Sequence, residues 1–285
     1  MILKEASPRV QSLFDNTVVW DNHACMPLRP GDTEFLPQLE RCRLAGITVV
    51  FLNVSMDLNP PDCALTMLAT FRHWIAAQPN DYLLVESLDD IVAAKQSGRL
   101  AICFDIEGGR AVEPHPGLVE VYYRLGVRWM LIAYNQNNGL GGGCQDDDPG
   151  LSDYGRLIID EMEKVGMVLC CSHTGYTTAL QAMEHASKPV IFSHSNPRAL
   201  HDHPRNIPDE LMQACAETGG VVSINGIGDF LGDKDNSTET LLNHIDYTAK
   251  LIGPEHVGLG LDYVYDLGEL ETYIAQHPDS FPPDK

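Results

Sequence analysis

Four short apolar runs in the sequence each end in a side chain that can bind a metal ion. The last residues of these runs are His23, Glu107, His173 and His194. A run of apolar and β-branched residues that stops at a polar side chain predicts a buried parallel strand with a polar tip. Such tips converge only where the strands lie side by side and point the same way. The sequence therefore predicts that these side chains share one site.

Imidazole, carboxylate and thiolate groups are all competent ligands for zinc and similar metals. Cys25 follows His23 by two residues and adds a thiol to the set. A carboxylate can bridge two ions, and metal pairs about 3.5–4 Å apart serve hydrolases by activating a bound water. A single histidine at a strand end is usually structural, but repetition at successive strand tips favours a metal site. We predict a site for one or two zinc ions with the ligands His23, Cys25, Glu107, His173 and His194.

Two further side chains suit a hydrolase. Asp262 ends another predicted strand and is placed to serve as general base and acid. Arg205 lies in a loop, where an arginine is usually solvated, but its guanidinium can also hold a substrate carboxylate through two hydrogen bonds. Asp21 and Asp105 lie within predicted strands, and we expect them to accept hydrogen bonds from ligands or from the core.

Strands and helices alternate along almost the whole chain. Eight main strands are predicted, at 17–23, 47–54, 100–106, 127–134, 167–171, 190–193, 220–224 and 257–261, with a short one at 82–86. Helices are predicted at 34–45, 64–77, 88–95, 118–125, 154–165, 177–185, 209–218, 238–252 and 267–276. Eight strands with intervening helices indicate an α/β fold of the TIM-like (β/α)8 barrel type, with a doubly wound open sheet as the alternative. No linker or repeat divides the chain, so we predict a single metallo-hydrolase barrel domain over residues 1–285.

Two predicted loops are long, and such loops commonly carry function. The first, Asn135–Asp153, contains a glycine-rich stretch followed by three aspartates. It lacks the Lys-Ser/Thr ending of a phosphate-binding loop, and its aspartates would repel phosphate, so we predict a flexible lid or rim. The second, Asn196–Asp209, contains Arg205. Residues 280–285 include two prolines, and we expect them to be frayed.

The composition excludes some classes of protein. The net charge is −21, from 40 acidic and 19 basic residues, which argues against nucleic-acid partners and against adhesion to anionic membranes. Hydrophobic residues make up 44% of the chain, enough for a sizeable core. The amino terminus has no apolar signal segment, so we expect a cytoplasmic protein whose eight cysteines are reduced.

The chain resembles the membrane (renal) dipeptidase family of metallopeptidases over most of its length, from about Thr17 to Asp262. The strongest stretches are 165–173, which ends in Cys-Cys-Ser-His, Phe192-Ser-His-Ser, Arg205-Asn-Ile-Pro-Asp209 and 219–225. The resemblance implies a TIM-like barrel, a binuclear zinc site, hydrolysis of dipeptides that include some with a carboxyl-terminal D-residue, and a homodimer.

Carried over by position, the resemblance implies a role for each candidate residue. His23 and Cys25 occupy the places of the ligands of the first metal, Glu107 that of the bridging carboxylate, and His173 and His194 those of the second metal. Arg205 matches the residue that holds the substrate carboxylate, and Asp262 matches the acid/base aspartate.

Three positions depart from the family pattern. The His-x-Asp of the first metal is His23-Ala-Cys25 here, and a thiolate is a softer ligand than a carboxylate. The family's Leu-Thr-His-Asn is Ile132-Ala-Tyr134-Asn135, so Tyr134 would donate the hydrogen bond that polarises the substrate carbonyl. Cys170 stands where the family usually has an aspartate.

We predict a metal-dependent dipeptidase in which Glu107, Asp262 and Tyr134 are catalytic and Arg205, Tyr134 and Asp262 bind the substrate. One alternative is an amidohydrolase that acts on a non-peptide carboxylated amide or an N-methylated amino-acid derivative. Another is a catalytically inactive binding protein, because a fold alone does not establish activity.

Overall fold

The computed structural model describes residues 6–60 and 62–282. Its strands run parallel in one curved sheet, in the order β6-β5-β4-β2-β1-β8-β7. The bounds are β1 Trp20–Cys25, β2 Val49–Met56, β4 Leu100–Glu107, β5 Val127–Leu131, β6 Val168–Cys170, β7 Val222–Ile224 and β8 Val257–Leu259. Two short strands extend this sheet, since β3 (Tyr82–Leu84) pairs with β4 and β9 (Tyr263–Val264) pairs with β1.

Single parallel bridges close the sheet into a ring. Ile191 bridges Cys170 of β6, and the next residue, Phe192, bridges Val222 of β7. The predicted strand at 190–193 is therefore reduced to two bridging residues, each paired on one side only. It still fills the eighth position, and the TIM-like barrel predicted from the sequence is confirmed.

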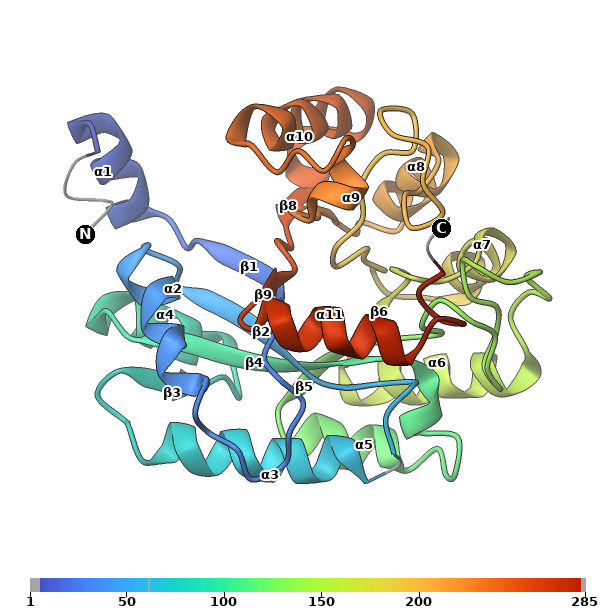
Figure 1. The fold of residues 1–285 in the computed structure, drawn as a ribbon, viewed down its shortest axis with the longest axis horizontal. Coiled ribbons are helices and arrows are strands. Elements are labelled where there is room, and N and C mark those ends of the chain that lie inside the picture. Colours follow the sequence, from blue (N-terminus) through green and yellow to red (C-terminus); the bar gives the residue numbers. More distant parts are fainter. Residues whose placement is uncertain (1–5, 61, 283–285) are drawn as a thin grey trace.

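Helices surround the ring (Figure 1). They are α1 Pro8–Asn16, α2 Glu40–Leu44, α3 Cys63–Ala76, α4 Leu88–Ser97, α5 Leu118–Arg124, α6 Asp153–Val165, α7 Tyr176–His185, α8 Asp209–Glu217, α9 Gly228–Leu231, α10 Thr238–Ile252 and α11 Leu267–Gln276. Most predicted helices begin and end within two residues of these observed bounds. The helix α1 was not predicted; it buries none of its residues, although Val10, Leu13 and Phe14 recur at helical spacing.

The predicted helix at 34–45 is wrong in its first half. Leu36–Leu39 form a 3₁₀ turn, and only Glu40–Leu44 are α-helical. Leu36 and Leu39 are both buried, and the three-residue repeat of a 3₁₀ turn puts such a pair on one face. Pro37 at the start of the turn fits this tight geometry.

The α6 helix shows how local sequence fixes an element. The Ser152 side chain accepts a hydrogen bond from the Gly155 amide at its start, and Gly166 ends it in the left-handed conformation at φ 87°. Between these caps Ile158, Ile159 and Met162 are buried against the barrel. Each such side chain contributes about 1.5–3 kcal/mol through burial.

Residues after β9 return to the carboxyl end of the barrel. In Figure 1 the helix α11 crosses in front of the strands, and Ser280 is buried. The Ser280 carbonyl accepts a hydrogen bond from the Asn135 side chain at 3.2 Å. The Phe281 ring packs edge-on against Tyr134. The prediction that the tail is frayed is thus wrong for Ser280 and Phe281, while residues 283–285 lie outside the described residues.

The long loop after β5 is a rim rather than a free lid. The Gly142 amide donates to Thr178 Oγ1 at 2.8 Å, and the Leu140 side chain is fully buried. Both contacts tie the loop to its surroundings, so the flexible lid expected from its glycines is not supported. Within the described ranges no helix is long and apolar enough to cross a membrane. None of the eight cysteines, which all lie within the described ranges, forms a disulfide.

Candidate metal centre

One carboxylate oxygen is the meeting point of three imidazoles at the carboxyl ends of the barrel strands. Glu107 Oε1 lies 3.4 Å from His23 Nε2, 3.3 Å from His173 Nε2 and 3.2 Å from His194 Nε2. The two last-named nitrogens are 2.9 Å apart. These residues come from β1, the end of β4 and the segments after β6 and after Phe192, so the barrel brings together positions up to 171 residues apart in number.

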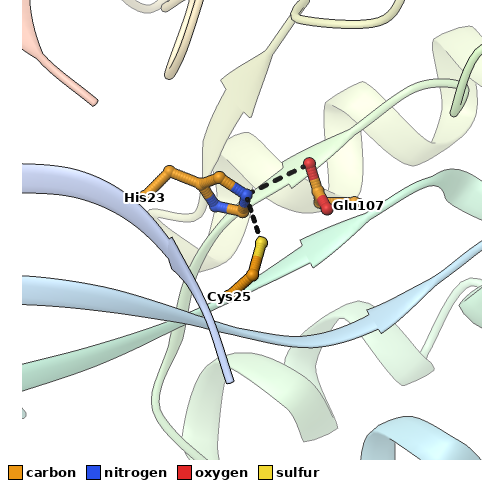
Figure 2. Close-up of side chains that lie close together, drawn as sticks. All are labelled: His23, Cys25 and Glu107. Carbon is orange, nitrogen blue, oxygen red and sulfur yellow. Dashed lines mark hydrogen bonds and ion pairs between the residues drawn. The ribbon is translucent and has the colours of Figure 1, made fainter. Parts of the chain in front are cut away.

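Two donor groups share Glu107, and in each group the donor atoms lie within 4.8 Å of one another. We call the first the thiol site and the second the histidine site; they consist of His23, Cys25 and Glu107, and of Glu107, His173 and His194. Figure 2 shows the thiol site, in which the thiol and the carboxylate both face the same imidazole nitrogen. Cys25 Sγ is 3.4 Å from that nitrogen. β1 extends to Cys25 because β9 pairs with it.

Each of the three imidazoles is held by an oxygen at its other nitrogen. His23 Nδ1 lies 3.2 Å from Asp105 Oδ2, which confirms the role expected for Asp105. His173 Nδ1 is 2.6 Å from Asn135 Oδ1, and His194 Nδ1 is 2.7 Å from Ser193 Oγ. Partners of this kind fix the ring orientation and leave Nε2 free for a metal.

Asparagine side chains hold the outer oxygens of two carboxylates, Glu107 and Asp262, in the same way. Asn53 Nδ2 donates to Glu107 Oε2 at 3.2 Å, and Asn225 Nδ2 donates to Asp262 Oδ2 at 2.9 Å. The opposite oxygens point into the centre, where Glu107 Oε1 is buried and accepts no hydrogen bond. A buried carboxylate oxygen without a donor is costly unless a cation satisfies it. The donor set therefore fits a metal ion.

Asp21 is the other aspartate that the sequence placed within a strand. Its Oδ1 accepts a hydrogen bond from the Leu261 amide at 2.8 Å, one residue before Asp262. It thus ties the last strand to β1, as a core acceptor of the kind we expected. Burial raises the pKa of Asp21 to about 6, although the amide hydrogen bonds oppose the shift.

Burial sets the protonation of the histidine site. It lowers the pKa values of His173 and His194 well below the usual range, and the positive charges of Arg205 and His23 lower them further. Both rings are therefore neutral near pH 7, which is the form that binds a metal. For His23 burial also lowers the pKa, but the carboxylates of Glu107 and Asp105 outweigh it and raise the pKa.

The two remaining donors hold protons in the absence of a cation. Burial raises the pKa of Glu107 to about 8, although neighbouring His23 opposes the shift. Burial raises the pKa of the Cys25 thiol well above its usual range, and the thiol donates to Asp262 Oδ1 at 3.4 Å. A metal ion in the centre would lower both values, since a cation favours the charged forms.

Tyr134 covers the histidine site. Its ring stacks on His173 with centroids 4.1 Å apart, and burial keeps its pKa well above the usual range. The Tyr134 amide donates to Asp57 Oδ2 at 3.1 Å, so the chain leaves the sheet after Leu131 and not at Tyr134 as predicted. Tyr134 thus presents a protonated hydroxyl, able to donate a hydrogen bond, beside the candidate metal ligands.

Arg205 is a buried cation without an anionic partner in the described part of the chain. Its side chain is only 4% exposed, and Nε has no hydrogen-bond partner. The guanidinium lies over the Phe230 ring at 5.2 Å, and one nitrogen donates to the His194 carbonyl at 3.4 Å. A buried charge of this kind is unfavourable unless a ligand supplies the opposite charge.

Three of the five described non-glycine residues with positive φ lie at this centre, and the other two, Asp233 and Lys234, follow α9. Asn135, His173 and Asp262 all adopt positive φ, at 58°, 62° and 56°. Residues other than glycine rarely occupy this region, and such strain clusters at functional sites. It aims three side chains inward from the ends of their strands.

The structure brings every predicted site residue to this centre or its edge. The residues that sequence reasoning missed are the ones that hold the ligands, Asn53, Asn135, Ser193 and Asn225. Asn53 lies inside an apolar strand and Asn225 directly after one, and a polar residue in such a place is the signal that could have found them.

Comparisons with known proteins identify the family of this chain. The sequence profile of the family described as membrane dipeptidase (peptidase family M19) matches residues 37–273. An uncharacterized dipeptidase of Schizosaccharomyces pombe is 34% identical over 210 residues, which cover 70% of this chain and 50% of the relative. Dipeptidase verJ of Clonostachys rogersoniana is 32% identical over 195 residues, which cover 67% of this chain and 50% of the relative. The chain thus spans about half the length of the curated relatives it matches.

Solved structures show the same fold. An amidohydrolase from Pseudomonas aeruginosa superposes with a TM-score of 0.87 and 28% identity, covering 95% of this chain and 82% of that one. A metallo peptidase from Rhodobacter sphaeroides, solved with a phosphinate mimic of the dipeptide L-Ala-D-Ala, gives a TM-score of 0.76 at 18% identity, covering 91% and 93%. Because the family profile matches most of its length, this chain belongs to the membrane dipeptidase family, peptidase family M19.

Proposed function

We propose that this chain hydrolyses the amide bond of dipeptides at a metal centre. One observation carries the proposal: two donor groups share Glu107 beside the buried, unpaired guanidinium of Arg205. The donors suit a metal, and the guanidinium suits the carboxylate at the end of a short peptide. Membership of the dipeptidase family supports the choice of a peptide substrate.

Bound metal ions would be held by the thiol site and the histidine site, and they would supply Lewis acidity and lower the pKa of a water molecule. Arg205 binds the substrate carboxylate and so fixes the scissile amide over the centre. The Tyr134 hydroxyl donates a hydrogen bond to the carbonyl oxygen as negative charge develops there. Asp262, held through Oδ2 by Asn225, accepts a proton at Oδ1 and passes it to the leaving amine.

The proposal is tested with protein purified without chelator, assayed on a panel of dipeptides with L- and D-residues at the carboxyl end. We expect turnover that disappears after dialysis against a chelator and returns when zinc is added. Matching N-acylated amino-acid amides, which lack a free carboxylate for Arg205, should be poor substrates. Metal-loaded protein that leaves the whole panel intact would contradict the proposal.

A second candidate rests on the residues that depart from the family pattern. Cys25 and Tyr134 stand where the family has aspartate and histidine, and a relative of 28% identity is described as an amidohydrolase. These changes favour a non-peptide carboxylated amide or an N-methylated amino-acid derivative as substrate. Turnover of such compounds without turnover of dipeptides would select this candidate.

The identity of the metal, the assembly, the domain organisation and the location are further parts of this proposal. We propose zinc as the metal, a homodimer as the assembly, a single barrel domain and a cytoplasmic location. Elemental analysis tests the first, light scattering in solution the second, limited proteolysis the third and fractionation of the source cells the fourth.

A further inference from the structure

A cavity of about 210 Å³ opens beside the histidine site. His173 forms part of its wall, together with the loop after β5 on one side and the segment that carries Arg205 on the other. The volume is about seven times that of a water molecule in the liquid, which is room for one amino-acid side chain. Because it adjoins both His173 and Arg205, this cavity lies where the carboxyl-terminal residue of a bound dipeptide would project.

A second arginine, Arg198, lines the same cavity. Its Nε is buried and has no hydrogen-bond partner, and no carboxylate among the described residues forms an ion pair with it. One of its terminal nitrogens donates to the Pro204 carbonyl at 3.2 Å, which anchors the guanidinium. The cavity therefore holds two cationic side chains with unused donors, although one substrate carboxylate requires only Arg205.

The backbone keeps these two arginines in fixed positions. Pro197 and Ile207 form a parallel bridge, so the segment between them is a closed loop with one arginine near each end. The Arg198 amide donates to the Ile207 carbonyl at 2.8 Å, and Asn206 Nδ2 donates to the carbonyls of His201 and Phe230 at 2.8 Å each. A loop held by this many bonds presents the guanidiniums as a prepared pair.

Two carboxylates also line the cavity, but they already have other partners. Asp148 Oδ1 accepts from Thr178 Oγ1 and the Gly150 amide, and Oδ2 accepts from the Thr178 amide. Asp146 Oδ2 accepts from the Asn137 amide at 2.8 Å. Neither carboxylate pairs with an arginine, so both guanidiniums keep donors for a ligand.

We propose that the preferred substrates carry an acidic residue at the carboxyl end, with the α-carboxylate on Arg205 and the side-chain carboxylate on Arg198. This proposal rests on the proposed function, since it assumes that Arg205 binds the α-carboxylate. Charge-assisted hydrogen bonds from an anchored guanidinium to a carboxylate are among the strong ones in proteins. They should favour glutamate or aspartate over the isosteric amides by about tenfold or more.

The test compares kcat/KM for Ala-Glu with that for Ala-Gln, and for Ala-Asp with that for Ala-Asn, using metal-loaded protein. The ratio of acid to amide should be at least about ten and should fall to about one in Arg198→Gln. Arg124→Gln, which removes an exposed arginine on α5, is the matched control and should keep the ratio of the wild type. A ratio near one in the wild type, or a ratio that survives Arg198→Gln, would overturn the proposal.

A binding measurement separates this inference from the proposed function. Calorimetric titration with free glutamate and free glutamine, which share the α-carboxylate, reports the side-chain contact without any turnover. Tighter binding of glutamate that is lost in Arg198→Gln would support the inference even if no dipeptide were hydrolysed. Equal binding of the two amino acids would overturn it even if dipeptides were good substrates.

Discussion

The thiol site and the histidine site share Glu107 but differ in how they are prepared for a metal. In the histidine site, burial keeps both imidazoles neutral, and Asn135 and Ser193 hold their outer nitrogens. In the thiol site, burial keeps Cys25 protonated, and its proton points to Asp262. A ligand must lose its proton before it binds. Two neighbouring groups of donors can therefore contain the same number of candidate ligands and still differ in how readily they bind a metal.

The largest expected effect comes from the residue that the two sites share. Glu107→Gln keeps the shape of the side chain and an oxygen for Asn53, but it removes the negative charge from both sites. We expect loss of all bound metal and a fall in kcat/KM of about 10³-fold or more. Elemental analysis and the dipeptide assay measure the two effects on one preparation. Glu120→Gln, on the exposed face of α5, is the control, and retention of metal by Glu107→Gln would refute the shared role.

The next largest effect concerns the hydrogen bond that the Tyr134 hydroxyl, beside the histidine site, is proposed to donate to the substrate carbonyl. Tyr134→Phe keeps the stack on His173 and removes only the hydroxyl. We expect kcat to fall by about 10²-fold, the usual loss for one donor to a developing oxyanion, while metal content stays that of the wild type. Stopped assays at saturating substrate measure kcat. An unchanged kcat would show that Tyr134 merely packs against the ligand.

A smaller effect, on metal affinity, tests the difference in protonation between the thiol site and the histidine site. In Cys25→Asp the protonated thiol is replaced by a carboxyl group, whose ordinary pKa of about 3.9 lies well below the value of about 8.5 for a thiol, so it gives up its proton to a metal more readily. We expect the affinity for the second metal equivalent to rise by about tenfold or more near pH 7.

The pH dependence of metal affinity, compared between the wild type and Cys25→Asp, tests whether the thiol releases its proton when metal binds. In the wild type the affinity of the thiol site should rise as pH rises, because binding releases the Cys25 proton, by up to tenfold per pH unit for that proton. His23 and Glu107 are present in both proteins, so we assign the difference between their slopes to the change of the side chain at position 25. Competition with a chromogenic chelator at several pH values measures both slopes. Identical slopes would show that Cys25 is not a ligand.

Sequence patterns predicted the barrel and brought forward the candidate metal-binding side chains for the same reason. An apolar run that ends in histidine or glutamate indicates a buried strand and places its last residue at the carboxyl end of the sheet, as in β4, which ends in Glu107. The residues that hold the ligands could not be predicted in this way. Asn135 and Asn225 become partners of His173 and Asp262 only through the ring closure and the positive φ values, which a linear pattern does not contain.

Short elements were also difficult to predict from sequence patterns. The helix α1 has nine residues, fewer than the window of about 11–18 residues over which helical periodicity is judged, and the strand predicted at 190–193 is reduced to two bridging residues. The thiol at Cys25 was visible in the sequence, but its protonation was not. That depends on burial and on the neighbouring Asp262, which is 237 residues away along the chain.

The smallest effect tests whether support of the ligands explains the readiness of the histidine site. Ser193→Ala removes the oxygen that lies 2.7 Å from His194 Nδ1 and 3.1 Å from Cys170 Sγ. Loss of such a partner typically lowers metal affinity by about 10–100-fold, and we expect about tenfold here because the buried ring keeps its packing against Trp129. Ser223→Ala, which removes a buried hydroxyl from β7 that contacts Asn22 instead of a ligand, is the matched control. If both variants lose metal equally, general packing rather than the hydrogen bond to His194 holds the histidine site, and the contrast with the thiol site rests on protonation alone.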